Sequence, residues 1–195
     1  MKYEIIKNDR IFSEFFKVDR VELKHENFRD QDLSQVRRYH LNRPEAVAVI
    51  LENETTGNIV LVEQFRYSSL KKSIRNGWTQ EIIAGLLDEG EEPIDCARRE
   101  TMEETGYQVH NLEFITTYFA SVGISDELVH LFYGTVTNED KIEDGGGLED
   151  ESEDLAIREL SFSQIMEDIR VGNIRDAKTI IGLQWLALKK LSPPS

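Results

Sequence analysis

The sequence has one cysteine, few basic residues and no long apolar run. Because Cys96 has no second cysteine to pair with, an internal disulfide framework is excluded, which is compatible with a reducing cytoplasm. No apolar stretch approaches the roughly 20 residues that a transmembrane helix needs. The charged N-terminus, MKYEIIKNDR, lacks the apolar segment of a signal peptide. We therefore expect a cytoplasmic protein with no membrane partner.

Basic residues are too scarce for a polyanion-binding protein. The 195 residues include 23 Lys and Arg against 37 Asp and Glu, which gives a formal net charge of −14. Nucleic acids and anionic membranes are bound by clustered basic residues, so neither is expected as a partner. Residues 139–154 alone carry nine carboxylates against Lys141. If such a protein acts on an anionic substrate, we expect a metal ion to bridge the two.

The length fits one domain of ordinary size with a substantial core. Apolar segments and helical patterns interleave without a regular strand–helix–strand repeat, which predicts an α/β fold with a mixed sheet and helices on both faces. A polar turn is expected at 25–36, and a buried stripe of the last helix at Ile180, Ile181, Trp185 and Leu188. Residues 1–24 are expected to form two or three strands, and single strands are expected at 45–52, 59–65, 78–84, 112–119, 127–136 and 154–160. The expected helices are 93–105, 161–172 and 176–190.

Residues 85–107, GLLDEGEEPIDCARRETMEETGY, are the most informative stretch. A glycine-bracketed loop leads to Pro93, which suits a first helical position. Gly106 suits the position just after a helix. An apolar stripe at helical spacing supports the helix between them and consists of Ile94, Ala97, Thr101 and Thr105.

Three carboxylates share another face of this helix. Glu103 and Glu104 follow Glu100 by three and four residues, which places all three on neighbouring parts of one face. Like charges three or four residues apart destabilise a helix by a few tenths of a kcal/mol per pair. Arg98 and Arg99 offset part of this repulsion. A hard divalent cation, which prefers oxygen ligands, offsets the rest most simply. The alternative is a solvated acidic face with no ligand.

The segment resembles the Nudix box, G-x5-E-x7-R-E-U-x-E-E-x-G-U, in which U is a bulky apolar residue. Every glycine and charged position of the motif is matched, and Thr101 departs from it at the first U position. The resemblance implies an α/β/α sandwich with a mixed sheet. It also implies an enzyme that hydrolyses a diphosphate linked to another group.

The resemblance also implies an ion site for Mg²⁺, with Mn²⁺ as a possible substitute. Its ligands would be Glu100, Glu104 and the backbone carbonyl of Ala84. An acidic residue after the glycine triplet 145–147 would be a further ligand; Glu151 fits best, with Asp150 and Glu153 as alternatives. The resemblance places Arg99 and Glu103 among the catalytic residues. Arg99 would orient the carboxylates, Glu103 is alternatively a further ligand or a support for the ligands, and Glu91 is structural.

Outside the box, the chain is similar to ADP-ribose and nucleotide-sugar pyrophosphatases at 63–66, 125–127, 145–154 and 174–179. This similarity implies that Arg66 binds the substrate's phosphates and that Glu127 is a general base or orients water. Lys178 either contacts substrate or supports a helix N-terminus. Further substrate contacts are expected from Arg37, Arg38 and Phe16, although an aromatic residue there also suits a core.

The substrate and the assembly are left partly open. ADP-ribose hydrolases usually have proline where this chain has Val122, so GDP-mannose and UDP-glucose compete with ADP-ribose, our first choice. A non-catalytic nucleotide-sugar sensor and a purely structural acidic protein are the alternatives from other classes. We divide the chain into a strand region, residues 1–43, and a Nudix domain, residues 44–195. In this branch the N-terminal strands commonly exchange across a homodimer, so we expect a dimer.

Overall fold

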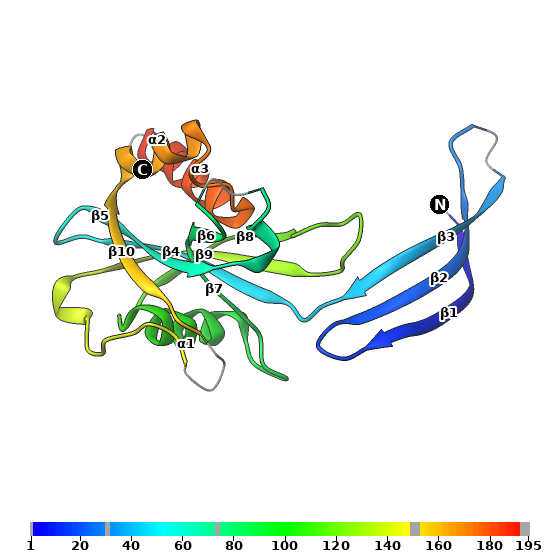
Figure 1. Ribbon diagram of the computed structural model, residues 1–195, viewed down its shortest axis with the longest axis horizontal. Helices are drawn as coiled ribbons and strands as arrows, with labels where there is room; N and C mark the ends of the chain where they lie inside the picture. Colours follow the sequence, from blue (N-terminus) through cyan, green and yellow to red (C-terminus); the bar gives the residue numbers. More distant parts are fainter. Residues whose placement is uncertain (1, 30–31, 73–74, 149–152, 192–195) are drawn as a thin grey trace. The chain divides into compact units, whose positions relative to one another are not determined.

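The structure, a computed structural model, describes residues 2–29, 32–72, 75–148 and 153–191 (Figure 1). The chain divides into two units. The first unit is Met1–Glu45 with Tyr118–Leu128, and the second is Ala46–Thr117 with Val129–Ser195. None of the helices in the described ranges has the length and apolar character needed to cross a membrane.

The first unit is built on an antiparallel sheet of β1 (Tyr3–Ser13), β2 (Lys17–Glu26) and β3 (Leu33–Asn42), in that order. The predicted turn at 25–36 is wrong at both ends, because β2 runs to Glu26 and β3 begins at Leu33. Every side chain of β3 is exposed or half-buried, so polar residues are tolerated there and hide the strand pattern. The segment 118–128 joins the end of β3, where the Leu41 amide donates to the Ile124 carbonyl at 2.7 Å.

The second unit is a mixed sheet between helices (Figure 1). The strands are β4 (Ala46–Asn53), β5 (Asn58–Phe65), β6 (Trp78–Glu81), β7 (Ile83–Leu86), β8 (Leu112–Phe119), β9 (Leu128–Val136) and β10 (Ala156–Ser161). Their order is β10-β5-β4-β9-β8, with β6 on β5 and β7 on β4. β4 is parallel to β9 and antiparallel to β5 and β7. Two short 3₁₀ helices, η1 (Tyr67–Ser69) and η2 (Asn138–Asp140), complete the connections.

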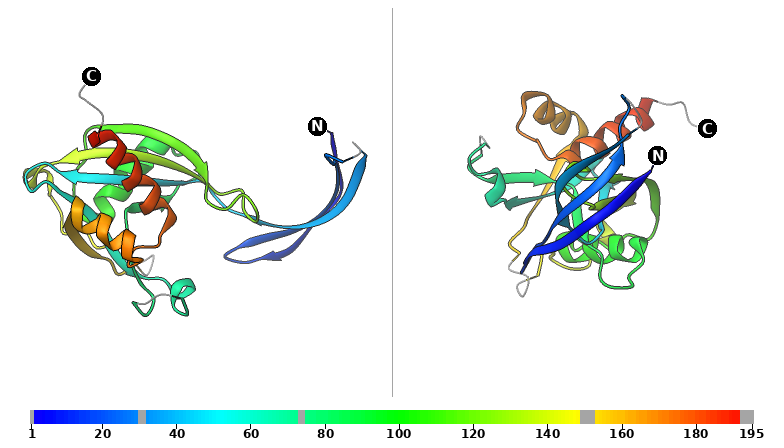
Figure 2. Two further views of the ribbon diagram at one scale, coloured as in Figure 1. Left: turned by 90° about the horizontal axis from the view of Figure 1, so that it is seen from above. Right: turned by 90° about the vertical axis from the view of Figure 1, so that its right-hand side faces the viewer.

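Helices cover both faces of this sheet. α1 (Pro93–Thr105) lies on one face, and α2 (Phe162–Val171) and α3 (Ala177–Leu191) lie on the other (Figures 1 and 2). The expected α/β/α sandwich with a mixed sheet is therefore confirmed. β4 separates the two cores, since successive side chains of a strand point to opposite faces. Val47, Val49 and Leu51 pack in one cluster with Cys96 and Ala97 of α1.

The predicted buried stripe of the last helix is wrong in phase. Ile181 is 37% exposed and Leu188 is 66% exposed, whereas the buried positions are Thr179, Gly182, Leu183 and Leu186. A Cβ on Gly182 would lie 2.9 Å from Cγ1 of Ile50 on β4. The helix therefore approaches the sheet along its smallest residue. Ile181 turns away from the sheet, while Ile180 and Trp185 are half-buried.

The single strand predicted at 78–84 is two strands, separated at Ile82. β6 pairs with β5, whereas β7 pairs with β4. The Ile82 amide leaves the ladder and donates to the Thr179 hydroxyl of α3 at 2.9 Å. Glu81 therefore ends the strand beside β5, while Ala84 lies in the strand beside β4.

Candidate functional site

The acidic helix α1 has the predicted boundaries. Pro93 begins it, and Gly106 ends it in the left-handed region with φ of 73°, its amide donating to the Met102 carbonyl at 2.7 Å. Thr101, the departure from the motif, is fully buried. Its hydroxyl donates to the Ala97 carbonyl at 2.7 Å, so the buried polar atom is satisfied within the helix.

Two carboxylates of α1 are buried against β7. Glu104 is 1% exposed and accepts a hydrogen bond from the Ala84 amide at 3.3 Å. Glu100 is 8% exposed. A Cβ on Gly85 would lie 1.9 Å from the Glu100 carboxyl carbon. Glycine is therefore required at Gly85 because the Glu100 carboxylate occupies the space of a side chain there.

Arg99 gathers three carboxylates onto one guanidinium. Its Nε and Nη2 donate to the two oxygens of Glu91 at 3.0 Å each. Its Nη1 donates to Glu100 at 2.8 Å and to Glu103 at 2.9 Å, and Nη2 also reaches the Leu86 carbonyl at 3.2 Å. All three nitrogens of the Arg99 guanidinium therefore donate hydrogen bonds to neighbouring carboxylates. A catalytic role for Arg99 or Glu103 beyond this arrangement stays a prediction.

The Arg99–Glu91 pair predicts a pH dependence of stability. Hydrogen bonding to Arg99 and to the Asp88 amide lowers the pKa of Glu91 to about 2 from an ordinary 4.5. A carboxyl with a depressed folded-state pKa stabilises above its unfolded pKa and loses that contribution as pH falls towards the folded value. We expect Glu91→Gln to lower the free energy of unfolding at pH 6, and the deficit to shrink between pH 4.5 and pH 2. Urea unfolding of both proteins across this range measures it; a pH-independent deficit would contradict the assignment.

The cations near Glu100 and Glu104 do not compensate for the burial of these two carboxylates. Burial raises the pKa of Glu100 to about 7, against the opposing effect of Arg99. Burial, and next the charge of Glu100, raise the pKa of Glu104 well above its ordinary value. A divalent cation would favour the charged forms, and two carboxylates with a backbone carbonyl are the hard oxygen donors that Mg²⁺ prefers. Among the described residues, no three His, Cys, Asp or Glu side chains form a ready metal site.

The glycine triplet 145–147 packs against the C-terminal end of α1. The Gly146 amide donates to the Glu104 carbonyl at 2.9 Å, and the Gly147 amide donates to the Glu103 carbonyl at 3.1 Å. All three glycines have positive φ, between 70° and 109°. The triplet therefore satisfies carbonyls that the end of a helix leaves without intrahelical partners.

Glu153 is a charged neighbour of the buried pair. Glu153 lies close enough for its charge to raise the pKa of both Glu100 and Glu104. Glu151, predicted as a metal ligand, and Asp150, its alternative, lie outside the described residues. Their roles stay predictions.

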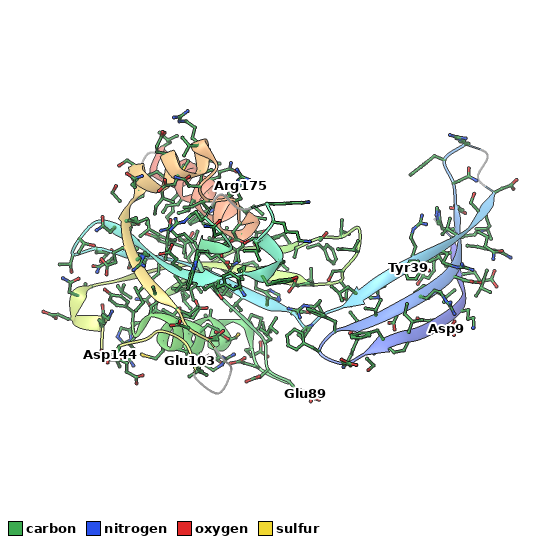
Figure 3. All side chains as sticks on the ribbon, in the orientation of Figure 1. Asp9, Tyr39, Glu89, Glu103, Asp144 and Arg175 are labelled. Carbon is green, nitrogen blue, oxygen red and sulfur yellow. The ribbon has the colours of Figure 1, made fainter. Side chains whose placement is uncertain are left out.

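A second cluster joins Arg66, Glu81 and Lys178. Arg66 donates to both oxygens of Glu81, from Nε and from Nη2, at 3.0 Å each, and the Lys178 ammonium contacts the same carboxylate. These residues line a cavity of about 610 Å³. Figure 3 shows Arg175, also in its lining, and Glu103 of α1 on opposite sides of the sheet. The cavity is further lined by Ser68, Ser69, Lys72, Asn173 and Asp176.

Glu81 was not predicted as a site residue, although its sequence context carries a signal. It is a charged residue inside the predicted strand 78–84, directly before the apolar residues Ile82 and Ile83. A carboxylate buried in such a strand needs a cationic partner. Lys178 and Arg66 overcome the effect of burial and lower the pKa of Glu81 to about 2. Arg66 and Lys178 are thus brought together, and their contact with substrate stays a prediction.

The remaining predicted residues lie in the first unit. Glu127 pairs with Arg43 at 3.5 Å, and the guanidinium carbon of Arg43 lies 5.4 Å from the centre of the Phe16 ring. Arg37 pairs with Glu22 at 2.8 Å, and Nη1 of Arg38 donates to the carbonyl of Arg37 at 3.0 Å. The proposed roles of Glu127, Phe16, Arg37 and Arg38 stay predictions.

Comparison with known proteins supports the same family over most of the chain. The NUDIX domain model matches residues 42–189. A GDP-mannose pyrophosphatase of Cronobacter sakazakii is 36% identical over 189 residues, with 97% of each chain covered. One of Shigella flexneri is 35% identical over 163 residues, with 84% of each chain covered.

A solved structure, titled "Crystal structure of ADP compounds hydrolase", supports the fold. It superposes with a TM-score of 0.72 at 20% identity and covers 97% of this chain and 96% of its own. At that identity the likeness concerns the fold alone. The family match over residues 42–189 and the relatives at about a third identity carry the assignment further. The chain therefore belongs to the NUDIX domain family and is a Nudix hydrolase.

Proposed function

We propose that this hydrolase cleaves the diphosphate of a nucleoside diphosphate sugar, giving a nucleoside monophosphate and a sugar phosphate. The buried Glu100–Glu104 pair beside Ala84 is the observation that carries the proposal. Two relatives named GDP-mannose pyrophosphatase favour GDP-mannose as the substrate. ADP-ribose, favoured by the sequence alone, and UDP-glucose are the competing substrates.

The residues of α1 and β7 would hold the required ion. Glu100, Glu104 and the Ala84 carbonyl are the proposed ligands for Mg²⁺, or Mn²⁺ in its place, with Glu151 as a further ligand. When bound, such an ion neutralises phosphate charge and activates water for attack on phosphorus. Arg99 would keep the Glu100 carboxylate in position, because its guanidinium donates to it at 2.8 Å.

Other side chains would bind the substrate and handle the proton. Arg66 and Lys178 face a cavity and would bind phosphate oxygens. Glu127 would orient water or accept its proton, with Glu103 as the alternative. Contacts with the nucleoside would come from Arg37, Arg38 and Phe16, in part from a second copy of the chain.

We also propose a cytoplasmic location and a homodimer formed through the first unit. The exposed apolar side chains of its sheet support the dimer and include Ile5, Ile11 and Phe12. A sedimentation mass of one chain would refute it.

The test is phosphate release, after coupling to a phosphatase, from GDP-mannose, ADP-ribose and UDP-glucose. We expect turnover with Mg²⁺, highest for GDP-mannose, and none after chelation with EDTA. Turnover that persists in EDTA would refute the metal requirement. Binding of a nucleotide sugar without turnover would favour a sensor, and the absence of both binding and turnover would refute the nucleotide-sugar assignment.

A further inference from the structure

Glu81 is the most fully paired charged side chain near the cavity. Its side chain is 4% exposed, and a buried carboxylate has about four positions at which it accepts hydrogen bonds. All are taken: one oxygen accepts from Nε of Arg66 and from the Thr79 hydroxyl, and the other accepts from Nη2 of Arg66 and from Lys178. The carboxylate has no capacity left for substrate or metal.

The groups around Glu81 come from three separate segments. Arg66 directly follows β5, Glu81 ends β6, and Lys178 lies in the first turn of α3. Long cationic side chains have many rotamers, and fixing them requires a rigid partner. A bidentate pair fixes the plane of the Arg66 guanidinium, as a single contact could not. Asp176, 3.1 Å from Lys178, holds the lysine from the other side.

Both cations still have capacity for a ligand. The Arg66 side chain is 44% exposed, and its Nη1 has no hydrogen-bonding partner among the described residues. The Lys178 side chain is 17% exposed and lines the same cavity. The cluster is also electrostatically close to the buried pair, because the charge of Glu104 acts on Arg66 and that of Lys178 acts on Glu104.

We propose that Glu81 is a positioning residue, which aims Arg66 and Lys178 jointly at the oxyanions of a diphosphate ligand. The proposal rests on the proposed function, in that the ligand is a diphosphate. Glu81 touches neither ligand nor water; it acts through the two cations. Its charge also leaves the four-group cluster with Asp176 neutral before a ligand binds.

The first measurement is the kinetics of Glu81→Gln with the best substrate. The amide keeps the shape but presents N–H groups to donors, so both cations should swing away. We expect KM to rise about tenfold or more while kcat falls less, since uniform binding of phosphate is lost. A fall in KM would overturn the proposal, because it would show that Glu81 merely competes with phosphate for the cations.

The control is Glu63→Gln, on the neighbouring strand β5. Glu63 is also a buried carboxylate that bridges two arginines, Arg75 and Arg158. Its loss should lower stability to a similar extent and leave KM unchanged. If both variants raise KM equally, the effect is structural and the proposal fails. Should Glu81→Gln not fold, Glu81→Asp keeps the charge, shortens the side chain and should raise KM several-fold.

A double-mutant cycle separates positioning from general stability. In a background lacking both cations, Arg66→Ala with Lys178→Ala, we expect Glu81→Gln to change the affinity for inorganic pyrophosphate less than twofold. In the wild-type background we expect a loss of about tenfold or more by calorimetry. Equal losses in the two backgrounds would overturn the proposal. Arg66→Gln with Lys178→Met, which removes both charges but keeps most of the side-chain length, replaces the alanine background if that fails to fold.

The measurement of pyrophosphate binding also distinguishes failure of the Glu81 proposal from failure of the proposed function. If the wild type binds pyrophosphate but turns over no nucleotide sugar, the substrate assignment fails while the Glu81 result still decides the inference. If nucleotide sugars are hydrolysed and Glu81→Gln behaves as wild type, the proposed function stands and the inference fails. Absence of pyrophosphate binding by the wild type would also overturn it.

Discussion

Glu104→Gln is expected to lower kcat/KM at least about a hundredfold without destabilising the metal-free protein. The carboxylate is 1% exposed and lies on the same helix face as Glu100. Glutamine keeps its size and its acceptor for the Ala84 amide. It removes a buried like charge, so the free energy of unfolding without metal should equal or exceed that of the wild type.

Metal should affect the two proteins differently. A ligand at about a hundred times its dissociation constant stabilises the folded state by about 2.7 kcal/mol. We expect Mg²⁺ to raise the unfolding free energy of the wild type and to have little effect on Glu104→Gln. The matched control is Glu89→Gln, an exposed carboxylate on the loop that Figure 3 shows extending from α1. Activity retained by Glu104→Gln, or lost equally by Glu89→Gln, would refute the ligand assignment.

Local pattern was enough to predict the elements that carry the box. α1 begins at Pro93 and ends at Gly106, because both positions are set by backbone chemistry that the residue types reveal. The mixed sheet between helices also followed from the order of apolar segments. These features depend on residues that are close together in the sequence, so they can be predicted without knowledge of tertiary contacts.

Features that depend on distant contacts were missed. The face that α3 buries is set by the close approach of Gly182 to Ile50, which no helical pattern reveals. The break at Ile82 exists because Thr179, 97 residues away in sequence, accepts its amide hydrogen. Glu81 likewise becomes a site residue only when Arg66 and Lys178 meet it. The candidate ligand residues could therefore be predicted from the sequence, whereas the residues that position them could be found only from the tertiary structure.

Gly85→Ala is expected to remove activity through Glu100, a residue 15 positions away. The methyl group would lie 1.9 Å from the Glu100 carboxyl carbon, so the carboxylate must move. Because Glu100 is 8% exposed and bound to Arg99, it has little room to do so. Overpacking of this kind typically costs about 1–3 kcal/mol of stability. We expect kcat/KM to fall about a hundredfold, as expected when a charge-stabilising group at a reaction centre is displaced.

The contrasting control is Gly90→Ala, in the loop that connects β7 to α1. Gly90 has φ of 81°, where alanine is strained by about 1–2 kcal/mol, but no atom lies within 4 Å of the added methyl group. The two variants should therefore lose comparable stability while only Gly85→Ala loses activity and Mg²⁺ stabilisation. Adding Glu100→Ala to Gly85→Ala should recover stability without activity, since the clash disappears together with the ligand. If Gly85→Ala and Gly90→Ala were equally active, the close packing of Glu100 against β7 would have no part in metal binding.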